Sequence, residues 1–124
     1  MAKMSAPELW HAGLAAFAAR DYFDVHEYLE ELWRRVPPAD KGPVQGLLQA
    51  AVCLYHFGNG NFAGARILAV AACQKLQAAP EEYRGLALGR FLQQFEAVTA
   101  PLHKPGERLR PMRPDQSPAP QQAV

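Results

Sequence analysis

The sequence predicts an all-α fold: a compact bundle of about five helices, made of two helical hairpins plus a C-terminal helix, followed by a disordered Pro-rich tail. Hydrophobic residues make up 49% of the chain. Ala and Leu dominate them and β-branched residues are sparse, which favours helix over sheet. Clusters of Pro and Gly divide the chain into segments of helical length, and apolar residues recur in these segments with helical spacing.

Length and charge set the expected organisation of the chain. Its 124 residues suit one domain, which we expect over residues 1–100, with a flexible and mildly basic tail over residues 101–124. The formal charge of +1 provides no general attraction to nucleic acid or anionic membranes, so we predict neither as a partner. There is no membrane-length apolar run and no signal-peptide core at the N-terminus, which predicts a cytoplasmic protein. Cys53 and Cys73 fall in apolar helical patterns and are expected to be free thiols.

The first hairpin is expected between two cap signals and a proline pair. Ser5 and Pro7 predict the start of a helix that continues to about Arg20. Asp21 can cap a second helix. Pro37 and Pro38 then stop that helix.

The second hairpin and a closing helix follow. A third helix over residues 44–57 is expected to be central, because apolar side chains occur on nearly every side of it. A turn rich in Gly and Asn leads to a fourth helix over residues 62–77. A fifth helix is expected over residues 81–99, where two glycines interrupt the apolar stripe. A shift of forty positions aligns Phe57 with Phe17 and Asn61 with Asp21. This internal similarity supports the division into two hairpins.

The polar side chains expected on buried helix faces form the candidate site. His26 and Glu30 share a face of the second helix at i, i+4, and Gln49 and His56 lie along one line of the third. We expect these groups to meet in a cleft between the two helices. The candidate cluster comprises His26, Glu27, Glu30, Trp33, Gln45, Gln49 and His56.

Three interpretations of this cluster remain open. It can be a structural hydrogen-bond network that sets the register of the two helices. His26, Glu30 and His56 can instead bind a divalent metal, although their spacing matches neither the HExxH of zinc proteases nor the ExxH of di-iron bundles. In the third interpretation His26 or Glu30 is a general acid or base. No nucleophile, phosphate loop or cofactor fingerprint accompanies them, so no catalytic residue or cofactor is assigned.

The order and spacing of several residues resembles the domain of unknown function 309 family, small all-helical proteins with an HExxExxW motif. The resemblance spans residues 9–80, with Ala18 and Val25 departing from the family pattern. It implies a fold and a motif, but no established activity. The residues that carry it are Phe17, Tyr22, Phe23, His26, Glu27, Glu30, Trp33, Gly46, Gln49, His56, Gly64 and Ala65.

We therefore predict a binding or scaffold protein rather than an enzyme, with a protein partner or a second copy as its ligand. One alternative is a metal-dependent enzyme that uses His26, Glu30 and His56. The other is a tetratricopeptide-like interaction module, because the first hairpin also resembles that repeat. A bundle is favoured over a solenoid, which needs more repeats. The positions that carry this second resemblance are Gly13, Tyr22, Val25, Leu29, Leu32 and Pro37.

Overall fold

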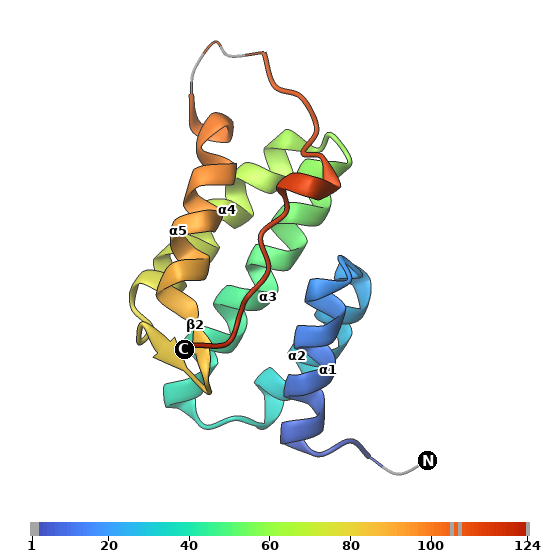
Figure 1. The fold of residues 1–124 in the computed structure, drawn as a ribbon, viewed down its shortest axis with the longest axis vertical. Coiled ribbons are helices and arrows are strands. Elements are labelled where there is room, and N and C mark those ends of the chain that lie inside the picture. The colour runs from blue at the N-terminus through green and yellow to red at the C-terminus, as the bar shows by residue number, and fades with distance from the viewer. Residues whose placement is uncertain (1–2, 105, 107, 124) are drawn as a thin grey trace.

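The computed structural model describes residues 3–104, 106 and 108–123. Within this part of the chain, two helical hairpins and a closing helix form a compact bundle, and each helix packs against the next along the chain (Figure 1). The prediction of an all-α bundle is confirmed. The helices are α1 (Ala6–Ala18), α2 (Tyr22–Arg35), α3 (Pro38–Gly58), α4 (Phe62–Gln77) and α5 (Leu88–Thr99).

Three helices begin at the expected side-chain caps. Ser5 and Glu8 form a reciprocal capping box at the start of α1. Asp21 and Asn61 accept hydrogen bonds from backbone N–H groups in the first turns of α2 and α4. These contacts satisfy N–H groups that have no partner within the helix, which explains why each helix starts where it does.

The third helix begins earlier than expected. The sequence predicts its start at residue 44, whereas α3 begins at Pro38 and continues through Pro43. Pro38 suits a first turn, where the missing N–H has no helical partner. A residue before proline normally avoids helical geometry because its Cβ meets the proline ring, but Gly42 has no Cβ. The central position of α3 between α2 and α4 agrees with the prediction.

The expected fifth helix is shorter and follows a small β-hairpin. Strands β1 (Glu82–Tyr83) and β2 (Leu86–Ala87) pair antiparallel in a segment for which the sequence predicts helix. Arg84 and Gly85 have φ values of 48° and 81°. Positive φ at both central residues is the requirement of a type I′ turn and is incompatible with a right-handed helix. The helix therefore begins only at Leu88.

The described residues of the Pro-rich tail are extended apart from two short 3₁₀ turns, η1 (Ala100–His103) and η2 (Pro114–Gln116). Its described residues run back along the bundle from the α3–α4 turn to the β-hairpin (Figure 1). Residues 105, 107 and 124 of the predicted tail lie outside the described part. The flexibility of the tail, and the domain boundary at residue 100, remain predictions.

Among the helices that the structure describes, none combines the length and the apolar character required to cross a lipid bilayer. The longest, α3, carries Asp40 and Lys41 near its start and the polar residues Gln45, Gln49 and His56 along its length. This finding agrees with the prediction that the bundle has no membrane-spanning segment.

Candidate functional site

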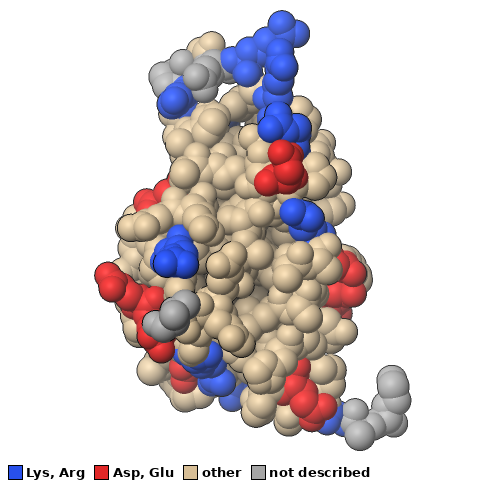
Figure 2. Space-filling view, viewed as in Figure 1, with Lys and Arg blue, Asp and Glu red and all other residues tan. Residues whose placement is uncertain are grey.

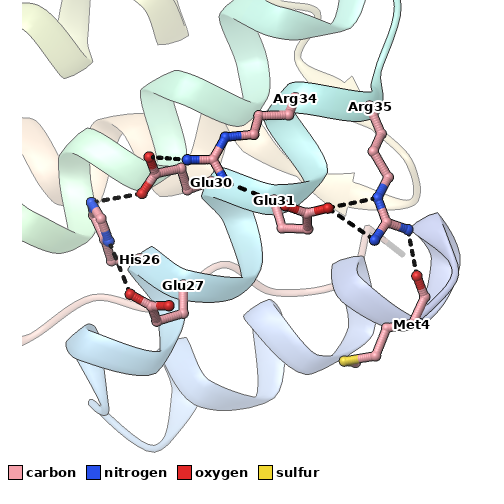
Figure 3. A network of polar contacts seen from close by, with 7 residues as sticks. All are labelled: Met4, His26, Glu27, Glu30, Glu31, Arg34 and Arg35. Atoms are coloured by element: carbon pink, nitrogen blue, oxygen red, sulfur yellow. Dashed lines mark hydrogen bonds and ion pairs between the residues drawn. The ribbon is translucent and has the colours of Figure 1, made fainter. Parts of the chain in front are cut away.

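A row of charged side chains follows one side of α2 (Figure 3). His26, Glu30 and Arg34 are spaced four residues apart, so they lie on successive helical turns. The His26 Nε2 atom lies 3.3 Å from Glu30 Oε2, and the Arg34 guanidinium donates to Glu30 Oε1 at 3.0 Å. Glu27 lies on the other side of the imidazole, 3.9 Å from Nδ1. We call His26, Glu27, Glu30 and Arg34 the α2 row.

The row continues into a second set of contacts that attaches the N-terminal segment. Glu31 accepts hydrogen bonds from Arg34 and Arg35. The Arg35 guanidinium also donates to the backbone carbonyl of Met4, which precedes α1 (Figure 3). The hydrogen bond from Arg35 is the main reason that the pKa of Glu31 is lowered. Arg35 therefore links the end of α2 to the start of the chain.

The α2 row is solvated rather than buried. The His26 and Glu30 side chains are 41% and 38% exposed, and Arg34 is 60% exposed. Water screens ion pairs at such positions, so each contributes a few tenths of a kcal/mol to stability. The row thus contributes little to folding, and its polar groups are available to other molecules.

Trp33 lies beside the row and is held from α3. Its indole packs partly buried against the hydrophobic core. The Lys41 ammonium lies 4.3 Å from the centre of the ring and donates to the Trp33 carbonyl at 2.6 Å. The indole Nε1 is buried and has no hydrogen-bond partner among the described residues. Trp33 is therefore fixed in place by packing and by Lys41.

The structure does not bring Gln49 and His56 to the α2 row. Gln49 accepts a hydrogen bond from Lys75 of α4 at 2.9 Å. The His56 Nδ1 atom lies 3.2 Å from the side-chain amide nitrogen (Nδ2) of Asn61, at the start of α4. Both residues belong to the side of α3 that faces α4, which also includes the buried Cys53, hydrogen-bonded to the Ala65 carbonyl. Gln45 of α3 is half-buried.

This arrangement separates the residues proposed as metal ligands. His26 and Glu30 are adjacent, but His56 is engaged at the α3–α4 turn. In the described part of the chain, no group of three or more His, Cys, Asp or Glu side chains is arranged to hold a metal ion. Glu27 and Glu30 lie against different nitrogens of the His26 ring, so these three side chains do not converge on one position.

Two exposed aromatic side chains that the predicted cluster does not include extend the candidate site. Phe23 is 71% exposed at the start of α2, and Tyr55 is 51% exposed near the end of α3. Because α2 and α3 pack antiparallel, these two ends lie at the same end of the helix pair (Figure 1). Phe23 precedes Glu27 by four residues and Glu30 by seven, and this spacing could have placed it on the charged side of α2.

A second polar and aromatic cluster joins α1, α3 and the β-hairpin. The rings of Trp10 and Tyr83 meet edge to face at 5.7 Å, with the Arg84 guanidinium beside both. The Tyr83 hydroxyl donates to Asp40 at 2.8 Å and accepts from Arg84. Burial is the main cause that raises the pKa of Tyr83, and the bond to Asp40 raises it further. These contacts fix the hairpin to the bundle, so we interpret the cluster as structural.

A separate groove lies between the end of α4, the hairpin and the start of α5. It has a volume of about 660 Å³ and is lined by acidic side chains, among them Glu81, Glu82 and Glu96, together with Arg90. A second groove of about 500 Å³ between α4 and α5 includes Val70 and Cys73. Neither groove includes a residue of the α2 row.

The fold and the site define a class: small helical-bundle proteins that present a charged and aromatic helix face to solvent. The family model described as "Domain of unknown function (DUF309)" matches residues 10–68 of the chain. The expected resemblance is confirmed. The role of the individual motif residues stays a prediction.

Two relatives extend this finding. The uncharacterized protein YpuF of Bacillus subtilis (strain 168) is 40% identical over 84 residues, which are 65% of this chain and 48% of YpuF. An uncharacterized protein of Aquifex aeolicus (strain VF5) is 29% identical over 92 residues, 73% of this chain and 28% of that protein. The chain thus spans about half the length of one relative and about a quarter of the other. No solved structure matches the chain.

Proposed function

We propose that this protein is a cytoplasmic binding protein that docks another polypeptide on the outer side of α2 and the end of α3. The docking face comprises the α2 row together with Phe23 and Tyr55. The observation that carries the proposal is the exposure of these two aromatic side chains, 71% and 51%, at the end of the helix pair where the solvated row of α2 begins. The free thiols of Cys53 and Cys73 support a reducing compartment.

The chemistry of the docking face matches that of transient protein interfaces. Such interfaces combine a few aromatic anchors with a polar rim, and the anchors supply most of the binding free energy. Phe23 and Tyr55 would be the anchors. Glu27 and Glu30 offer carboxylate oxygens to basic groups of the partner, while Arg34 already neutralises part of their charge. We therefore infer a partner with an apolar centre and basic groups at its rim.

Site-specific photo-crosslinking of the full chain in its own cells tests this proposal. A photoreactive residue replaces Phe23 in one variant and Ile67 of α4 in the control. Both positions are 71% exposed and apolar. We expect one discrete adduct from position 23 and none from position 67. An adduct with the mass of two chains would identify the partner as a second copy.

A second substitution in the crosslinking variant tests whether the face acts as a unit. Tyr55→Glu should abolish the adduct from position 23, because it places a charge at the second anchor, whereas Tyr55→Phe should retain it. The melting temperature should be unchanged, because exposed side chains contribute little to stability. The proposal is overturned if position 23 gives no adduct, or if position 67 gives the same one.

A further inference from the structure

The end of the chain lies on the bundle in the manner of a bound peptide. Residues 108–123, which we call the strap, run from the α3–α4 turn to the β-hairpin across the front of the view in Figure 1. The surface on this side is mostly uncharged (Figure 2). Lys and Arg gather instead at the end of the molecule where the tail leaves η1, a stretch that includes the exposed Lys104, Arg108 and Arg110.

Backbone hydrogen bonds hold the strap at both ends. The Met112 N–H donates to the Phe57 carbonyl at 3.2 Å, at the end of α3. At the hairpin, the Ala87 N–H donates to the Gln121 carbonyl at 2.9 Å, and the Ala123 N–H donates to the Gly85 carbonyl at 2.8 Å. Gln122 forms an antiparallel bridge with Leu86. The strap thus adds a short strand to the free edge of β2, which is a common mode of peptide recognition.

Few side chains of the strap contact the bundle. Met112 is the main anchor and is only 7% exposed. Leu109 and Ala119 pack against the core with less burial, and Ser117 hydrogen-bonds to the Tyr22 hydroxyl. Prolines occupy much of the remainder, and they favour an extended backbone without needing a partner for an N–H group. The attachment therefore consists of one deep anchor, spaced shallow ones and backbone bonds at the ends.

We propose that the surface beneath the strap is a peptide-binding groove, and that the strap is its resident intramolecular ligand. The class of ligand that fits is an extended polypeptide segment with spaced prolines and one deep apolar anchor, whose C-terminal part pairs with β2. A segment of this kind from another protein occupies the groove when the strap leaves it. This inference uses residues outside the docking face and does not depend on the proposed function.

Competition between the strap and a free peptide tests the inference on the full chain. The probe is a fluorescent synthetic peptide of residues 108–123. In the wild-type protein the tethered strap has an effective concentration in the millimolar range, so the free peptide should bind only weakly. Met112→Glu removes the apolar anchor of the strap, and this variant should bind the peptide at least tenfold more tightly. Met112→Ala should give a smaller gain in the same direction.

Two controls show that the gain comes from release of the strap. Gln121→Glu adds the same charge to an exposed side chain of the strap, so this variant should behave as the wild type. A peptide that carries Met112→Glu itself should not bind. Hydrogen exchange at the Ala87 amide should be faster in the Met112→Glu protein and should slow again when the wild-type peptide is added.

Two results would overturn the inference. Equal peptide binding by the wild type and both Met112 variants would show that no groove is exposed. Loss of the helical circular dichroism signal in the Met112→Ala protein would show that the strap is an integral part of the core. Retained helicity with gained peptide binding supports a separable ligand.

Discussion

At the residue scale, a polar contact was predictable when both partners belong to one helix. His26 and Glu30 meet as expected, because an i, i+4 pair is set by helix geometry alone. Gln49 and His56 also share one side of α3, as expected, but that side faces α4. The spacing does not predict whether the His26–Glu30 pair is buried or solvated. The solvation of the α2 row depends on α3 leaving that side of α2 uncovered.

The exposure of the α2 row predicts a small effect on stability. His26→Ala should change the free energy of unfolding by less than about 0.5 kcal/mol, because an exposed pair is screened by water. Leu29→Ala, one turn away at a fully buried position, should cost about 2–5 kcal/mol. Urea unfolding of the two variants measures both values. A cost above about 1 kcal/mol for His26→Ala would mean that Glu30 is left unpaired in a buried place.

Close packing of α3 on α4 predicts a larger effect at Gly46. A Cβ at this position would lie 3.2 Å from Lys75 Cβ and 2.9 Å from Leu76 Cδ2. Because the Lys75 Cβ cannot move without its helix, Gly46→Ala should destabilise the protein by about 1–3 kcal/mol. Gly89→Ala in α5 is the matched control, since its Cβ would meet atoms no closer than 3.5 Å. Thermal unfolding measures both melting temperatures. An equal decrease for Gly46→Ala and Gly89→Ala would contradict this account.

At the element scale, helix boundaries followed side-chain caps and prolines, whereas the β-hairpin was missed. Apolar residues before α5 continue a helical stripe, and this periodicity concealed the turn. Gly85 was recognised as an interruption, but a single Gly is compatible with a helix. The hairpin is decided by the positive φ of Arg84 and Gly85 and by the contacts of Tyr83 with Trp10 and Asp40.

The turn geometry can be tested at Gly85. Gly85→Ala should destabilise the protein by about 1 kcal/mol, because a residue with Cβ is strained at positive φ. No described atom lies within 4 Å of the position that a Cβ would occupy, so a steric clash does not contribute. Urea unfolding measures the effect, with Gly89→Ala as the control at ordinary helical φ. An unchanged free energy of unfolding for Gly85→Ala would mean that the hairpin contributes nothing to stability.

At the scale of the whole molecule, α3 and α4 form the central pair, and their interface buries an ionisable group. Cys53 is fully buried, and its thiol donates to the Ala65 carbonyl at 3.2 Å. Burial raises the pKa of Cys53 to about 12 and that of the partly buried Cys73 to about 11. The folded bundle therefore keeps the Cys53 thiol protonated at pH values where the unfolded chain releases the proton.

This difference predicts a loss of stability at alkaline pH. Above the ordinary thiol pKa the unfolded state binds fewer protons than the folded state, so the free energy of unfolding should fall as pH rises toward 12. The contribution of Cys53 to the slope approaches 1.4 kcal/mol per pH unit. Cys53→Ala should flatten the slope in urea unfolding between pH 8.5 and about 10.5. An identical slope in both proteins would show that folding does not raise the pKa of the Cys53 thiol.

The sequence by itself determined the all-α class, the order of the helices, the central position of the third helix and the local His26–Glu30 pair. These features depend on caps, breakers and helical spacing, which act within a few residues. Tertiary structure alone decided that Gln49 and His56 face α4, that Phe23 and Tyr55 remain exposed, and that the strap returns to β2. Periodicity specifies which residues share a side of a helix, but the neighbour on that side is chosen by packing across the whole chain.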